Sequence, residues 1–130
     1  MESRAYRFLG IAGMLLASGT VVGALGAHAL RGVLGARQLE SLDTAVDYQL
    51  VNALGLALVA LLMKGGAQRG LGAIAWMLVA GVLCFSGGIY LMLAGAPSFL
   101  GLVTPVGGVL LIAAWTAFAT MMLLRARRQP

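Results

Sequence analysis

Side chains able to do acid–base chemistry are rare in this sequence, and two of them stand close to long apolar segments. His28 is the one histidine, and Asp47 ends an acidic segment that also contains Glu40 and Asp43. A carboxylate beside an imidazole can fix its tautomer and raise its pKa. If the fold brings His28 and Asp47 together, they would form an ionisable pair at the edge of a small pocket.

Neutral hydrogen-bonding side chains accompany this pair and interrupt otherwise apolar segments. The predicted polar pocket combines them with the ionisable pair: His28, Asp47, Tyr48, Gln49, Asn52, Ser86, Tyr90 and Thr104. Polar groups without partners are costly in hydrocarbon, so they must pair with one another, with water or with a ligand. We favour mutual pairing that locks the helices, and keep a ligand pocket as the alternative.

Other chemistry is poorly supplied. One histidine, one cysteine (Cys84) and no acid inside an apolar stretch cannot complete a metal site within one chain. Haem held by two symmetry-related copies of His28 is a remote option, and we expect no metal and no cofactor. The sequence contains no nucleophile-elbow, P-loop, HExxH or dinucleotide motif, so we assign no catalytic residue.

Charge patterning predicts the elements that position these residues. Charged residues make up 10% of the chain, against about a quarter in soluble domains, and hydrophobic residues make up 61%. Charge is absent from 8–30, 48–63, 71–93 and 105–124. A membrane-spanning helix needs about 20 apolar residues. The pattern excludes a soluble domain and predicts an all-α integral membrane four-helix bundle, a single domain over 1–130, with spans at about 8–30, 46–63, 71–93 and 105–124.

Segment 35–47 is amphipathic, with its charges on one side of a helical wheel. We predict that it forms an N-terminal extension of the second helix, which would run unbroken from about 36 to 63; a separate interfacial helix is the alternative. Thr104 and Pro105 are expected to begin the fourth helix as N-cap and first residue. The 8–27 run is longer than a signal-peptide core of about 7–15 residues, so we predict a retained first helix rather than a cleaved signal.

Four spans place both termini on one side of the membrane. That side carries seven basic residues (Arg4, Arg7, Lys64, Arg69, Arg125, Arg127, Arg128), and the other carries Arg31 and Arg37. In membrane proteins the loops rich in Lys and Arg lie on the cytoplasmic side, so we predict an inner-membrane protein with both termini cytoplasmic. The basic residues flank the spans and form no continuous face, which argues against a nucleic-acid partner.

Small residues predict where helices approach closely. Gly19, Gly23 and Gly26 share one face of the first helix, and Gly107 and Gly108 lie near the start of the fourth. Glycine faces of this kind allow close contact between helix backbones. The contact can be within the chain or with a second copy, and we favour the former.

Four motifs resemble one family. Gly23–Leu30 (GALGAHAL) resembles its GAFGAH signature, and TAVDYQ at 44–49 followed by NAL at 52–54 resembles TAxxYQxxHAL. FSGGIYL at 85–91 and TPVGG at 104–108 resemble FSGSLYL and TPxGG. Together they resemble the YgdD-like small inner-membrane proteins, a family of unknown function, which implies a four-span inner-membrane protein. The family usually has His at the position of Asn52 and Ser at that of Gly88.

Three functions remain open at this point. We favour a structural or accessory protein that acts through helix packing, as a homo-oligomer or with a membrane protein partner, in contact with membrane lipids. The predicted topology places the residues of the polar pocket at one depth, in the outer part of the bundle. The alternative function is therefore a lipid- or small-ligand-binding protein or membrane enzyme that uses this outer-leaflet pocket. A small transporter is less favoured, because proton-coupled export needs an acidic residue deep in a span and none is present.

Overall fold

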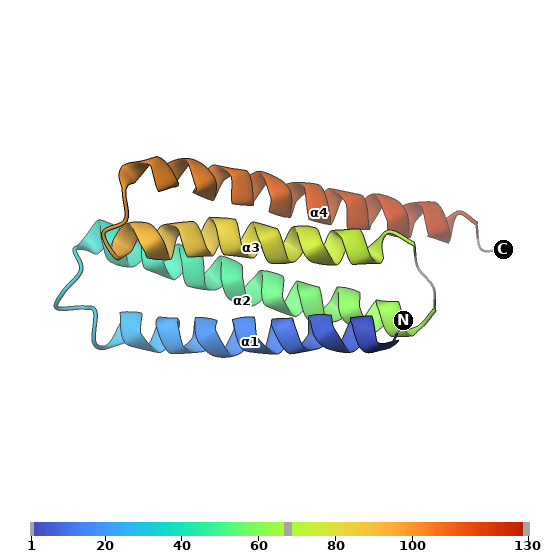
Figure 1. The fold of residues 1–130 in the computed structure, drawn as a ribbon, viewed down its shortest axis with the longest axis horizontal. Coiled ribbons are helices and arrows are strands. Elements are labelled where there is room, and N and C mark those ends of the chain that lie inside the picture. Colours follow the sequence, from blue (N-terminus) through green and yellow to red (C-terminus); the bar gives the residue numbers. More distant parts are fainter. Residues whose placement is uncertain (1, 67–68, 129–130) are drawn as a thin grey trace.

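The computed structural model describes residues 2–66 and 69–128, and this part of the chain folds into four long helices (Figure 1). They are α1 (Glu2–Ala27), α2 (Ala36–Lys64), α3 (Leu71–Leu93) and α4 (Val103–Ala126), with a short 3₁₀ helix, η1 (Ser98–Leu102), before α4. Each long helix has the length and hydropathy needed to cross a membrane. The predicted fold class, an all-α membrane bundle of four spanning helices, is confirmed.

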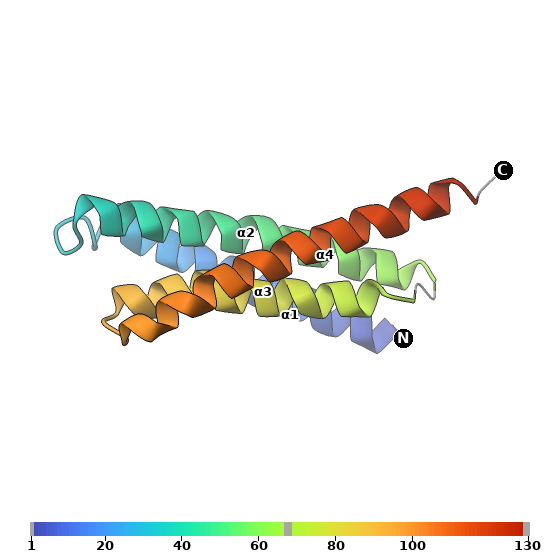
Figure 2. The same ribbon diagram turned by 90° about the horizontal axis from the view of Figure 1, so that it is seen from above.

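Consecutive helices pack side by side, so α2 and α3 are central and α1 and α4 lie at the edges. In the second view, α4 starts beside the C-terminal half of α3 and crosses obliquely toward the C-terminal half of α2 (Figure 2). The start of α1, the end of α2, the start of α3 and the end of α4 share one end of the bundle, here called the terminal end. The opposite end, with residues 28–35 and 94–102, is the distal end.

The amphipathic segment is part of one continuous helix. α2 runs from Ala36 to Lys64 without a break, which confirms the predicted extension and excludes a separate interfacial helix. Its first turn is capped by Gln38, whose Oε1 accepts a hydrogen bond from Gly35 N–H over 2.9 Å. No glycine or proline occurs between 36 and 54, so nothing in the sequence interrupts the helix.

Two predicted helix boundaries differ from the structure. α1 ends at Ala27, and His28 lies in the turns that follow it instead of in the helix. α4 starts at Val103, so Thr104 is inside the first turn and is not the N-cap. The reason is that η1 leads directly into α4, and Pro105 is tolerated there because first-turn N–H groups have no intrahelical partner.

Glycines with positive φ bracket the third helix. Gly70, at the N-cap of α3, has φ +97°, and Gly95, after its C-terminal end, has φ +92°. Residues with a Cβ atom rarely adopt these angles. These two positions therefore let the chain reverse sharply on either side of α3.

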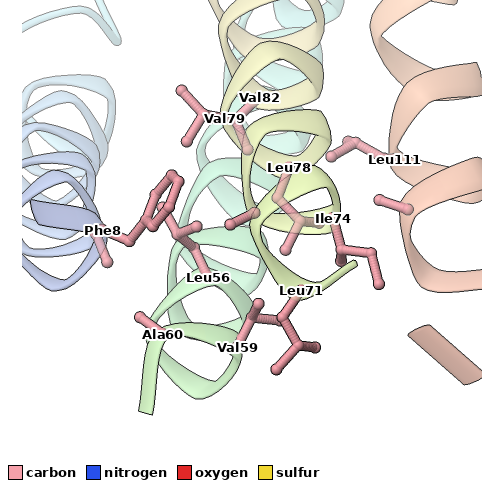
Figure 3. Close-up of a cluster of buried hydrophobic side chains, with 13 residues drawn as sticks. Phe8, Leu56, Val59, Ala60, Leu71, Ile74, Leu78, Val79, Val82 and Leu111 are labelled. Atoms are coloured by element: carbon pink, nitrogen blue, oxygen red, sulfur yellow. The ribbon is translucent and has the colours of Figure 1, made fainter. Parts of the chain in front are cut away.

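The apolar core occupies the half of the bundle nearer the terminal end. Phe8 of α1, Leu56 of α2, Leu78 of α3 and Leu111 of α4 belong to this core and are at most 4% exposed (Figure 3). Such side chains hold membrane helices together by van der Waals packing, since lipid supplies little hydrophobic drive. The buried polar residues lie beyond this core, from the middle of the bundle toward its distal end.

Candidate functional site

Three polar side chains are almost fully buried in the bundle. Gln49, Asn52 and Ser86 are 4%, 6% and 1% exposed. They take part in three neighbouring groups of hydrogen bonds: one joins Gln49 to Ser18 and Tyr90, one joins Asn52 to Trp115, and one joins Ser86 to the Ala45 carbonyl. These six side chains, Ser18, Gln49, Asn52, Ser86, Tyr90 and Trp115, are here called the amide cluster. Each of the four long helices contributes at least one member.

Gln49 of α2 joins α1 to α3. Its Nε2 donates to the Leu15 carbonyl oxygen over 2.8 Å and to Ser18 Oγ over 2.9 Å, both on α1. On the other side, the Tyr90 hydroxyl of α3 donates to Gln49 Oε1 over 2.7 Å. Because a carbonyl oxygen can only accept, Nε2 must face Leu15, which leaves Oε1 toward Tyr90. Both amide hydrogens and one acceptor position are therefore in use.

Asn52, nearly one turn further along α2, joins that helix to α4. The indole Nε1 of Trp115 donates to Asn52 Oδ1 over 2.8 Å, and Asn52 Nδ2 donates to the Tyr48 carbonyl oxygen over 2.8 Å. An indole N–H can only donate, so the orientation of this amide is also determined. The Trp115 ring lies directly on Gly55, where a Cβ atom would overlap it.

Ser86 ties α3 to the backbone of α2. Its Oγ donates to the Ala45 carbonyl oxygen over 2.6 Å, in the interior of the bundle. On the same two helices, the rings of Tyr48 and Phe85 stack with centroids 4.4 Å apart. These contacts fix the rotation and the register of α3 relative to α2.

The amide cluster gathers four of the eight residues predicted for the polar pocket: Gln49, Asn52, Ser86 and Tyr90. His28, Asp47 and Tyr48 are exposed, and neither His28 nor Asp47 contributes a side-chain hydrogen bond to the cluster. Thr104 lies apart from it, against Gly88, where a Cβ atom would come within 2.6 Å of Thr104 Oγ1. The structure thus separates His28 and Asp47 from the buried polar side chains.

Two members of the cluster were missed from the sequence. Ser18 and Trp115 sit on helices that are apolar on nearly every side, so hydropathy gives no rotational signal for them. The two backbone acceptors, the carbonyls of Leu15 and Ala45, have no sequence signature at all.

Hollows beside the predicted pocket are shallow. One of about 170 Å³ is lined by Asp47, Tyr48, Val51 and Asn52. Another of about 390 Å³, at the distal end, includes Ser41, Met92 and Thr104 among its lining residues. Among the described residues, no group of three or more His, Cys, Asp or Glu side chains could hold a metal ion.

The predicted packing glycines lie at contacts within the chain. Gly19, Gly23 and Gly26 of α1 face Leu50, Val46 and Leu42 of α2, with Cβ positions 2.9, 3.2 and 2.7 Å from those side chains. On α4, Gly107 lies against the α3 backbone at Cys84 and Phe85, and Gly108 faces the Phe85 ring at 3.7 Å. The α1 glycine face therefore accommodates α2 of the same chain.

Comparison with known proteins places this architecture among bacterial membrane proteins. Residues 22–108 match the model of a family described as "Protein of unknown function (DUF423)". The UPF0382 membrane protein YwdK of Bacillus subtilis is 37% identical over 115 residues, covering 86% of this chain and 90% of its own length. The UPF0382 membrane protein of Haemophilus influenzae is 31% identical over 99 residues, covering 75% and 78%. No solved structure gives a significant match.

Proposed function

This chain belongs to the DUF423 family, and from that premise we propose that this small integral membrane protein has a structural or accessory role, exerted through helix packing and a partner complex. The partner would be a second copy of the chain or another membrane protein. Catalysis has no part in the proposal.

The observation that carries the proposal is that the polar side chains of the amide cluster form their hydrogen bonds with other groups of the protein. Gln49 uses both amide hydrogens on α1 and accepts from α3, while Asn52 holds Trp115 of α4. Interhelical hydrogen bonds of this kind contribute about 0.6–2 kcal/mol each. A bundle locked in this way is suited to presenting a constant surface. The buried amides have few free hydrogen-bonding positions for a ligand, which disfavours a ligand-binding or enzymatic role for this layer.

The edge helices supply the surface for a partner. Met14 of α1 is 75% exposed and Ile112 of α4 is 70% exposed, on faces turned away from α2 and α3. In the membrane such apolar faces meet either lipid or another protein. A fixed partner on one of them would make the rigidity of the bundle functionally useful.

Cysteine cross-linking in native membranes tests the proposal. Cys84 is first replaced by Ala, and Met14→Cys and Ile112→Cys are then introduced separately. A discrete adduct of constant mass is expected from one position, and it should fail to form when the protein is diluted in excess detergent before the cross-linker is added. Monomers alone at both positions, together with a monomer in native mass spectrometry from lipid nanodiscs, would contradict the proposal.

We also propose that the protein lies in the inner (cytoplasmic) membrane with the terminal end of the bundle in the cytoplasm. Seven basic residues at that end, against two at the distal end, support this orientation. In the Cys84→Ala background, an impermeant maleimide applied to intact cells should label Ser98→Cys and leave Gly65→Cys unlabelled until the cells are permeabilised. The reverse pattern would contradict the orientation.

We likewise propose that the protein belongs among the YgdD-like proteins, which the four sequence motifs support.

A further inference from the structure

A cavity of about 460 Å³ opens between α1 and α3 at the terminal end, away from the amide cluster. It is lined by Ser3, Arg4, Arg7, Phe8, Ile11 and Trp76. The polar and charged members come from the first two turns of α1. The apolar members lie deeper along the helices.

Two pairs of residues build the wall and the floor of this cavity. Phe8 follows Arg4 by one turn on α1, and Trp76 follows Gly72 by one turn on α3. The rings of Phe8 and Trp76 meet edge to face with centroids 5.3 Å apart. The Arg4 guanidinium lies over Gly72, with Nη2 2.9 Å from the position of a Cβ atom there. A cationic mouth therefore stands above an aromatic floor.

Charge at this end is strongly one-sided. The terminal end carries seven basic side chains and a single acidic one, Glu2, while the other three acids belong to the distal half of the bundle. Lys64 is engaged with Tyr6, whose hydroxyl is 3.0 Å from Lys64 Nζ. α3 also begins beside the cavity with no acidic residue in its first turn, so its dipole adds to the positive potential.

We propose that this cavity binds an anionic phospholipid of the leaflet at the terminal end. The headgroup phosphate would lie between Arg4 and Arg7, and the upper part of an acyl chain would lie on Phe8, Ile11 and Trp76. From Arg4 to Ile11 the helix rises about 10 Å, which spans the distance from headgroup to acyl region. Tryptophan is enriched at this depth of the bilayer. The apolar floor favours a lipid over a free phosphate ion.

Trp76 lines the cavity and is 54% exposed, so its fluorescence can report occupancy. The protein is placed in phosphatidylcholine nanodiscs with increasing fractions of brominated phosphatidylglycerol or, separately, brominated phosphatidylcholine. The part of the quenching that disappears in Trp76→Phe belongs to this site. We expect stronger quenching by the anionic lipid than by phosphatidylcholine. The association constant of phosphatidylglycerol relative to phosphatidylcholine should fall about fivefold in Arg4→Gln and again about fivefold in Arg7→Gln.

The matched control is the double variant Arg125→Gln/Arg127→Gln, which removes the same two charges as Arg4→Gln and Arg7→Gln together, at the same end of the bundle but outside the cavity. It should keep most of the preference for phosphatidylglycerol. Quenching by brominated phosphatidylcholine shows that each variant is still inserted. Equal losses in the control and the Arg4/Arg7 variants would reduce the effect to surface potential and overturn the proposal. Competition by millimolar inorganic phosphate would also overturn it, in favour of a free-anion site.

Discussion

Gln49 accepts a hydrogen bond from Tyr90 over 2.7 Å, and the same side chain donates to α1 on its other side. A single amide on α2 therefore fixes the helices on both of its flanks. Because its two ends are chemically distinct, only one orientation of the amide satisfies both neighbours. The cluster thus specifies one rotation of each helix, which the nearly uniform apolar surfaces around it do not.

Replacing Tyr90 with Phe tests the α2–α3 half of this arrangement. The change leaves Gln49 Oε1 without its donor while keeping the ring, so the free energy of unfolding should fall by about 0.6–2 kcal/mol. Denaturation in mixed detergent and lipid micelles measures it. Tyr48→Phe is the control, because that side chain is exposed and outside the cluster. Equal effects of the two variants would contradict the assigned role of Tyr90.

Asn52 and Trp115 offer a second test, with a graded outcome. Asn52→Leu removes the acceptor of the indole N–H and should destabilise the bundle by about 1–3 kcal/mol. Asn52→His retains an acceptor nitrogen, and the resembling family usually has His there, so this variant should lose clearly less. The unfolding free energies of both, compared with Trp115→Phe, test the order. A histidine variant as unstable as the leucine variant would contradict it.

Gly55 lies under the Trp115 ring, and its replacement separates close packing from helix propensity. In Gly55→Ala the new methyl group overlaps a ring held in place by Asn52, which should cost about 1–3 kcal/mol. Gly87→Ala, on α3, has open space at the Cβ position and should be neutral or stabilising by up to about 1 kcal/mol. Thermal unfolding of the two variants in the same detergent provides the comparison.

The ionisable residues should be dispensable for the fold. His28 and Asp47 are exposed and outside the cluster, so His28→Ala and Asp47→Asn should each change the unfolding free energy by less than about 0.5 kcal/mol. A large loss in either variant would revive an ionisable pair at the distal end.

Much of this arrangement could be predicted from the sequence because it follows from charge alone. Segments without charge defined the four helices, and the unbroken run after residue 36 predicted the extended α2. The level of Gln49, Asn52, Ser86 and Tyr90 in the membrane then followed from the topology. Their common depth was enough to place them in one layer.

Rotation about each helix axis could not be predicted in the same way. Depth gave Asp47, Tyr48 and Gln49 nearly the same position, yet Gln49 is buried while its two predecessors are exposed. Trp115 counted as an apolar residue in the sequence, although its indole N–H donates to Asn52 and so fixes the rotation of α4 about its own axis. Backbone acceptors such as the Leu15 carbonyl are invisible in a sequence, because every residue has one. The family that this chain resembles usually has Ser at the position of Gly88. The sequence does not explain the glycine, but in the structure Thr104 lies directly against it.

A double-mutant cycle between Gln49 and Tyr90 tests the central claim most directly. Unfolding free energies are measured for Gln49→Ala, Tyr90→Phe, the double variant and the parent in one lipid system. The amide cluster predicts a coupling energy of about 0.6 kcal/mol or more, with the double variant less destabilised than the sum of the single ones. Strict additivity would show that the two side chains do not stabilise each other, and the account of a bundle locked by its buried amides would be wrong.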